Sequence, residues 1–235
     1  MNFAIIAAGE GSRLQQEGVG IPKPLIKLDN KPLIGRLIES IAEFRPESVS
    51  IIVNENFYEV TEYLDSYSSD FPINVIKKCT PSSMHSLFEL RNYLRGKPFM
   101  LFTVDTIFRR SDLTAYVRYC EKAPEGHNSV AITDYVDDEK PLYVRINDSG
   151  DALAFENEPN DNRYITGGIY YFSSDIFPLI QEIIRSGGKN LRLFLRELAA
   201  SGAPVKAFKF GKMIDVDRIG DIKAAEQFLM EEISV

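Results

Sequence analysis

The sequence predicts an α/β fold, with a mixed, mostly parallel sheet and helices on both of its faces. Through residue 126, short apolar or β-branched runs alternate with helical patterns, which is typical of βαβ units. From residue 127 several strand patterns follow one another directly, which indicates a more antiparallel part of the same sheet. No internal repeat or Pro/Gly/Ser-rich linker divides the chain. We therefore expect one domain over 1–235, with halves at 1–126 and 127–235.

Each element of the first half rests on its own pattern. The apolar run 3–8 ends at Gly9 and predicts a buried central strand. Apolar residues at helical spacing, with Pro32 in the first turn, predict a helix over 32–44. By the same arguments we expect strands at 48–54, 73–77 and 99–104 and helices at 56–66, 82–94 and 113–120.

The second half is richer in strands. Runs with strand character cover 129–136, 142–147, 152–157 and 165–173, and turn residues such as 148–150 separate some of them. Two helices are expected at 175–185 and 190–201, and further strands at 204–210 and 213–216. A C-terminal helix is expected over 219–232.

Composition narrows the range of functions. The 235 residues include 27 Lys and Arg against 34 Asp and Glu, a net charge of −7, and 44% are hydrophobic. Such a chain is globular, and its acidic balance argues against a broad nucleic-acid surface without excluding a local basic pocket. Cys79 and Cys120 are far apart, and we expect two buried, reduced thiols. The apolar N-terminus is too short for a membrane span and lacks a basic leader, so a cytoplasmic protein is expected.

A glycine-rich loop follows the first strand, where residues 7–14 are A-A-G-E-G-S-R-L. Gly9 and Gly11 permit positive φ and a close approach of the backbone to a ligand, and free N–H groups there can bind an anion. Arg13 can add a bidentate phosphate contact. Leu14 stands where a dinucleotide fingerprint needs its third glycine, and no Walker A motif is present. The alternative is a plain turn between strand and helix.

Lys23 lies between Pro22 and Pro24. Because proline fixes its own φ and restricts the preceding residue, the lysine has a preset direction. This suits a cation that contacts phosphate. The alternative is a solvated loop residue.

Three aspartates can meet at one edge of the sheet. Asp105 ends the strand at 99–104, and ligands of parallel sheets bind at the carboxyl ends of strands. Asp215 and Asp217 would share a face if their segment is extended. Gathered carboxylates repel unless a cation joins them, and Mg²⁺ or Mn²⁺ suits oxygen ligands. The alternative is a solvated turn in which Asp217 caps the helix that follows.

The helix predicted at 82–94 opens with Thr80-Pro81-Ser82-Ser83. Its hydroxyls and free N–H groups could hold a base, a ribose or an acceptor phosphate. Simple N-capping by Ser82 or Ser83 is the alternative.

The motifs over residues 3–34, A-A-G-x-G-S-R-L, P-K-P-L-I and K-P-L-I, resemble the nucleotidyltransferase family that makes nucleotide sugars and related activated phosphates. Sugar-1-phosphate nucleotidyltransferases and phosphocholine cytidylyltransferases belong to it. The resemblance implies a Rossmann-like, glycosyltransferase-A-like fold, with a nucleotide-binding half at 1–126 and an acceptor-binding half at 127–235 that supplies further metal ligands. It implies transfer of a nucleoside monophosphate from a triphosphate to a small phosphorylated acceptor, with release of pyrophosphate.

The resemblance also implies roles for individual residues. The catalytic residues would be Arg13, Lys23 and Asp105. Nucleotide-binding residues would be Ala7, Ala8, Gly9, Glu10, Gly11, Ser12, Arg13, Lys23, Ser82 and Ser83. The acceptor would meet Ser86, Gly168 and Tyr170, and the metal would be held by Asp105 and Asp217, with Asp215 as a third candidate.

The sequence departs from the family pattern at two positions. Val104 stands before Asp105, where the family more often has glycine, and Glu158 stands where many members have the lysine of E-K-P. Lys189 or Arg192 could supply the missing cation for the acceptor phosphate. The segment S-x-x-x-S-L at 82–87 is closer to phosphocholine-type enzymes than to many sugar enzymes.

Two other functions remain open from sequence. A metal-dependent glycosyltransferase would consume a nucleotide sugar and also use a D-x-D site. A nucleotide-sensing module would keep the pocket without turnover. The partners expected are small molecules, with no nucleic acid and no membrane, and the chain is expected to be a monomer or a small homo-oligomer.

Overall fold

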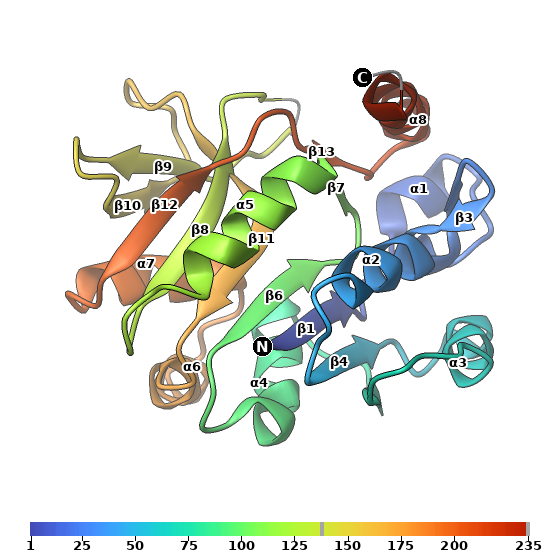
Figure 1. Cartoon of the computed structure of the whole chain (residues 1–235), viewed down its shortest axis with the longest axis horizontal. Coiled ribbons are helices and arrows are strands. Elements are labelled where there is room, and N and C mark those ends of the chain that lie inside the picture. The colour runs from blue at the N-terminus through green and yellow to red at the C-terminus, as the bar shows by residue number, and fades with distance from the viewer. Residues whose placement is uncertain (137–138, 234–235) are drawn as a thin grey trace.

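The protein is built around one mixed sheet, seen in the computed structural model, which describes residues 1–136 and 139–233 (Figure 1). Its first half supplies four parallel strands in the order β5–β4–β1–β6. They are β1 (Asn2–Ala7), β4 (Ser48–Val53), β5 (Ile73–Lys77) and β6 (Phe99–Thr103). The predicted α/β fold class is confirmed.

The second half extends this sheet with antiparallel pairs. Strand β11 (Ile165–Phe172) runs antiparallel to β6 and also pairs with β8 (Asn128–Thr133). Beyond these lie β12 (Val205–Lys209), parallel to β8, and the hairpin of β9 (Tyr143–Ile146) and β10 (Ala152–Glu156). The predicted change of character after residue 127 is therefore present.

Helices cover both faces, and the alternation of side chains along β1 shows why. Phe3 and Ile5 point into one apolar cluster, and Ala4 and Ile6 into the other. Each large side chain that becomes fully buried stabilises the fold by about 1.5–3 kcal/mol. The first cluster is covered by α2 (Leu33–Ala42), α3 (Tyr58–Asp65), α5 (Arg110–Cys120) and α8 (Ile219–Ile233). The second is covered by α4 (Ser83–Leu94), α6 (Ile176–Arg185) and α7 (Leu191–Ala200).

The structure also contains short elements that the sequence patterns do not reveal. They are α1 (Ser12–Gln16), the 3-10 helix η1 (Lys23–Leu25), β2 (Lys27–Leu28) with β3 (Lys31–Pro32), and β7 (Thr106–Ile107). The strand expected at 213–216 is only β13 (Ile214–Asp215), paired antiparallel with β7. The helix expected at 113–120 begins earlier, at Arg110. The strand expected at 129–136 ends at Thr133.

The strand order places a crevice between β1 and β6. From β1 the chain moves outward through β4 and β5, and then returns to the other side of β1 as β6. In open α/β sheets such a reversal separates the loops at the carboxyl ends of the two strands, and ligands bind there. The glycine-rich loop leaves β1 and Asp105 follows β6 at this point.

Two further expectations can be compared with the structure. Cys120 is buried, but Cys79 is exposed at the end of β5, so the expectation of two buried thiols is wrong for Cys79. Within the described residues, no helix has the length and apolar character needed to cross a membrane.

Candidate active site

The glycine-rich loop leads from β1 into the short helix α1. Ala8 is buried, whereas Gly9 and Glu10 are exposed. Gly11 has a φ of 65° at the N-cap of α1, and a Cβ there would lie 3.2 Å from the Cβ of Lys23. Of the two glycines, only Gly11 has the positive φ that the sequence suggested for both. Gly11 thus lets the loop pass close to Lys23.

Lys23 joins the loop side of the crevice to its acidic side. Its side chain is only 9% exposed, and Nζ donates to Asp105 Oδ2 and to Asp217 Oδ1, both at 2.5 Å. Arg13 donates from Nη1 to the other carboxylate oxygen of Asp217. The two cations expected to contact phosphate therefore both engage the acidic residues in this structure.

Three carboxylates form a cluster that tertiary pairing assembles. Asp105, Asp215 and Asp217 each place one oxygen within 4.8 Å of the other two. Strand β13 ends at Asp215, and the N–H of Asp217 donates to the Asp215 carbonyl at 3.1 Å, so the segment turns instead of staying extended. The N–H of Val216 donates to the Asp105 carbonyl at 3.1 Å. The carboxylates are therefore brought together by the pairing of β13 with β7. The two-residue period of an extended strand does not explain their convergence.

Burial and charge act together on the ionisation of this cluster. Burial alone would lower the pKa of Lys23, but the surrounding carboxylates, Asp105 first, outweigh it and raise the pKa above its usual range. Burial opposes ionisation of Asp105, yet Lys23 holds the pKa of that carboxyl below its ordinary value. Asp215 is partly open to solvent, but the dense protein around its carboxyl and the neighbouring Asp105 raise its pKa above the usual value. The cluster holds more negative charge than Lys23 alone can balance.

The donor set fits a hard divalent cation. Three carboxylate oxygens, contributed after β6 and around β13, face one small volume, and hard cations take oxygen ligands. Lys23 and Arg13 are positive charges that already sit against the same carboxylates. Within the part of the chain that the structure describes, Asp105, Asp215 and Asp217 thus form a group that could hold a metal.

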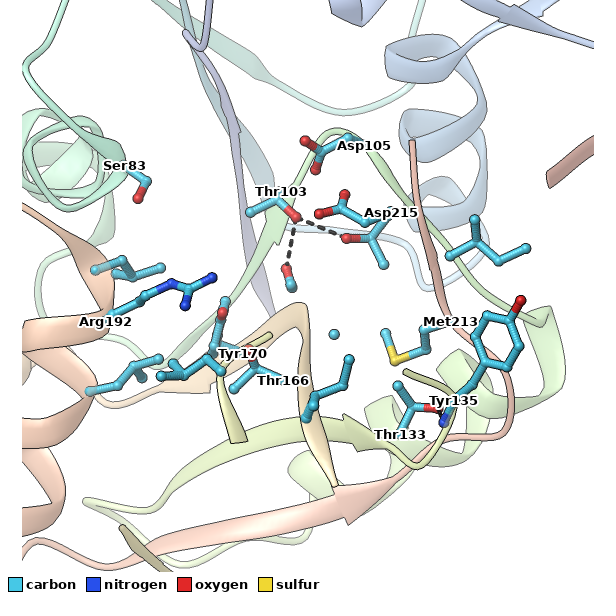
Figure 2. A pocket seen from close by; sticks show the side chains of 18 residues that line it. Ser83, Thr103, Asp105, Thr133, Tyr135, Thr166, Tyr170, Arg192, Met213 and Asp215 are labelled. Atoms are coloured by element: carbon cyan, nitrogen blue, oxygen red, sulfur yellow. Dashed lines mark hydrogen bonds between the residues drawn. The ribbon is translucent and has the colours of Figure 1, made fainter. Parts of the chain in front are cut away.

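A pocket of about 210 Å³ opens beside the acidic cluster. Figure 2 shows Asp105, Asp215 and Thr103 along one side, Ser83 and Arg192 at one end, and Thr133, Tyr135 and Met213 at the other. Strand β11 forms the middle, where its register with β8 shifts between Thr166 and Tyr170. The pocket is thus lined mainly by the second half of the chain.

The glycine pair of β11 allows this pocket to form. Gly168 has a φ of 75°, and a Cβ there would lie 2.3 Å from Thr103 Oγ1 and 2.4 Å from Thr106 Oγ1. The two threonine hydroxyls are 2.9 Å apart, and Thr103 donates to the Gly168 carbonyl at 3.4 Å (Figure 2). A Cβ on Gly167 would overlap Met213. Any larger residue at these positions would displace the wall of the pocket.

Only some of the residues expected to bind nucleotide or acceptor lie at the pocket. Ser83, Gly168 and Tyr170 line the pocket. Ser82 is the N-cap of α4, where its Oγ accepts from the His85 N–H at 3.5 Å. Ser86 is buried, and its hydroxyl is hydrogen bonded to Thr80 Oγ1 at 2.6 Å, so the structure does not bring it to the pocket.

The two candidates for the missing acceptor cation also differ. Arg192 lines the pocket from α7, whereas Lys189 is exposed and lies outside the lining. Arg192 donates to the carbonyls of Lys140 and of Pro141, the latter at 3.4 Å. Glu158, which replaces the family lysine, is exposed and is not part of the lining.

Several other lining residues carry no motif in the sequence. These threonines and apolar side chains of the wall include Thr103, Thr106, Thr133, Leu142, Leu191, Leu195 and Met213. Thr103 and Thr133 are the last residues of β6 and β8, and this position at a carboxyl end was the available signal. The others carry no local pattern that separates them from core residues.

Comparisons with known proteins identify the family of this chain. The chain matches the sequence family described as "Nucleotidyl transferase" over residues 4–232. It is 22% identical to "Bifunctional protein GlmU" of Methanococcus vannielii over 99% of this chain and 56% of that protein, so it spans about half the length of several curated relatives it matches. It is 24% identical to "UTP--glucose-1-phosphate uridylyltransferase AglF" of Haloferax volcanii, with 99% and 98% of the two chains covered. The solved structure of the inositol-1-phosphate CTP transferase from T. maritima has the same fold, with a TM-score of 0.82, 22% identity, and 99% and 95% coverage.

Proposed function

Because this chain belongs to the nucleotidyl transferase family, we propose that it transfers a nucleoside monophosphate from a nucleoside triphosphate to a small phosphorylated acceptor, releasing pyrophosphate. One observation carries the proposal. Lys23, next to the glycine-rich loop, meets Asp105 and Asp217 at the crevice between β1 and β6. This arrangement supports a reacting centre between an anion-binding loop and an oxygen-rich cluster.

The loop side would hold the triphosphate. N–H groups over Gly9–Ser12 and the guanidinium of Arg13 would bind the part that leaves as pyrophosphate. Lys23 would neutralise charge that develops on the α-phosphate. For this, Arg13 and Lys23 must exchange Asp217 for phosphate oxygens, which the partly exposed side chain of Arg13 can do by rotation.

The acceptor side needs no general base. A phosphate monoester has a second pKa near 6, so an oxygen of the acceptor phosphate is already an ionised nucleophile at neutral pH. It would attack the α-phosphorus as the bond to the pyrophosphate oxygen breaks. The protein's contribution is then in-line positioning and charge neutralisation.

Asp105, Asp217 and Asp215 would hold a divalent cation, Mg²⁺ or Mn²⁺. When bound, such an ion would supply positive charge that helps to neutralise the reacting phosphates. The carboxylates of this chain would hold it, and Lys23 and Arg13 would balance the remaining charge.

The pocket at the second half would receive the acceptor. Arg192 would contact its phosphate in place of the family lysine, and Tyr170 and the backbone of Gly168 would contact the rest. We thus propose that the half at 1–126 binds the nucleotide and the half at 127–235 binds the acceptor. A net charge of −7 supports a small-molecule acceptor over nucleic acid.

A pyrophosphate-release screen tests this proposal. Four ribonucleoside triphosphates and dTTP are each combined with sugar 1-phosphates and with phosphocholine, with Mg²⁺ present. The expected result is pyrophosphate from at least one pair, absent with Asp105→Asn protein. Release of a nucleoside diphosphate from a nucleotide sugar would instead identify a glycosyltransferase, and tight nucleotide binding without turnover of any pair would identify a sensing module.

A further inference from the structure

The segment that carries Asp215 and Asp217 is clamped from both sides by the residue that follows it. Arg218 donates from Nη1 to Glu17 Oε1 at 2.9 Å, and its Nη2 lies 2.5 Å from Glu139 Oε1. One guanidinium thus joins two carboxylates from distant parts of the chain. Neither contact belongs to the cluster of three aspartates.

Glu17 ties the glycine-rich loop to the start of α8. It is the C-cap of α1, and its second oxygen accepts from the Ile219 N–H at 2.8 Å. The backbone hydrogen bond from Ile219 and the side chain of Arg218 lower the pKa of Glu17, so it is charged at neutral pH. Figure 1 shows α1 close to α8, although they begin more than 200 residues apart. The C-terminal end of α1, the helix that follows the loop, is therefore fixed independently of Arg13 and Lys23.

Glu139 connects the same clamp to the acceptor pocket. It lies in the connection between β8 and β9, next to Lys140 and Pro141. The carbonyls of those two residues accept from Arg192, which lines the pocket. A displacement of Glu139 would therefore reach the cation proposed to hold the acceptor.

We propose that Arg218 is a positioning residue that holds the nucleotide loop, through Glu17, and the acceptor-side connection, through Glu139, against the acidic segment. The proposal rests on the proposed function for its kinetic consequences, but not for its structural ones. Arg218 acts through other residues and touches no reacting atom.

Exposed ion pairs usually contribute little, because ordering two long side chains offsets the attraction. In this clamp less side-chain conformational entropy is lost when the ion pair of Arg218 with Glu17 forms, because both partners are already held by other hydrogen bonds. Asp221 Oδ2 accepts from the N–H groups of Asp217 and Arg218 at 2.9 and 2.7 Å, which fixes the backbone from which the guanidinium projects. Glu17 is held by Ile219 as well. A lysine at 218 would keep the charge but lacks the fork that reaches two carboxylates.

Four variants separate the two arms of the clamp. Arg218→Gln should raise KM about fivefold for both the triphosphate and the acceptor. Glu17→Gln should raise KM for the triphosphate alone, and Glu139→Gln for the acceptor alone. Arg218→Lys should restore one of the two KM values but not both. The matched control is Lys97→Gln, which removes an exposed ion pair with Glu47 away from the crevice and should change neither value.

Amide hydrogen exchange measured without substrates tests the clamp independently of activity. Exchange over residues 9–22 should accelerate about fivefold or more in Glu17→Gln and Arg218→Gln, and stay at the wild-type rate in Glu139→Gln and Lys97→Gln. Wild-type exchange in Arg218→Gln would overturn the proposal, as would faster exchange with unchanged KM values. A wild-type protein that releases no pyrophosphate with any substrate pair would overturn the proposed function, while the exchange rates still decide on the clamp.

Discussion

The two sides of the crevice are built in different ways. The proposed nucleotide side comes mainly from one continuous stretch, residues 7–24, whose glycines and prolines set the backbone directly. The proposed acceptor side collects residues from β6, β8, β11, α7 and β13. On the first side the chemistry is local in sequence, and on the second it depends on strand pairing. The aspartate cluster joins the two, because Lys23 of one side contacts Asp105 and Asp217, and Asp105 also lines the pocket of the other.

This difference has a physical consequence. A loop with exposed backbone, such as Gly9 and Glu10, can move when a ligand arrives. The acceptor wall cannot, because Gly168 packs directly against Thr103 and Thr106 inside the sheet. Changes on the nucleotide side should therefore alter binding, and changes in the acceptor wall should also alter stability.

The largest expected effect is at Asp105, which belongs to the junction of the two sides. Asp105→Asn removes a charge that pairs with Lys23 and that the proposed metal would require, so turnover should fall about 100-fold or more. Steady-state kinetics measure it, and Asp65→Asn, on an exposed side chain paired with Lys77, is the matched control. Turnover within a few fold of wild type would remove Asp105 from the metal site.

The next effect contrasts two glycines with positive φ. In Gly168→Ala the new Cβ would overlap two threonine hydroxyls and the backbone would be strained, so the free energy of unfolding should fall by about 2–4 kcal/mol. Gly202→Ala has a φ of 78° but nothing within 4 Å of the new Cβ, and should lose only about 1 kcal/mol. Denaturant unfolding compares the two, and equal losses would show that the acceptor wall is not tightly packed.

A smaller effect is expected at Arg192. Loss of its charged hydrogen bonds in Arg192→Gln should raise KM for the acceptor about tenfold and leave KM for the triphosphate unchanged. Lys189→Gln, on the same side of the molecule but outside the pocket, should change neither value. If Lys189→Gln had the larger effect, the acceptor phosphate would lie elsewhere.

The same contrast explains how far sequence could predict this protein. The parallel strands of the first half and the motifs around Gly11 and Lys23 were predictable, because apolar runs, glycine and proline act over a few residues. The convergence of Asp215 and Asp217 on Asp105 was expected from strand periodicity, but pairing of β13 with β7 and a turn at Asp217 bring it about. Because the two strands are far apart in the chain, their pairing leaves no pattern in the sequence around either of them.

The acceptor wall was the least predictable part. Arg192 was one of two candidates, and only the packing of α7 beside β11 distinguishes it from Lys189. Ser86 sits in a motif that suggested a ligand contact, but the helical turn directs its hydroxyl to Thr80. The role of Arg218 depends on two carboxylates that lie far from it in sequence.

The fate of the phosphorus atoms tests the central claim most directly. The protein is incubated with Mg²⁺ and a triphosphate labelled either at the α- or at the γ-phosphorus, together with an acceptor found in the screen. The α-label should appear in the acceptor product and the γ-label in pyrophosphate. Transfer of the γ-label to the acceptor, or its release as inorganic phosphate with a nucleoside diphosphate, would contradict nucleotidyl transfer.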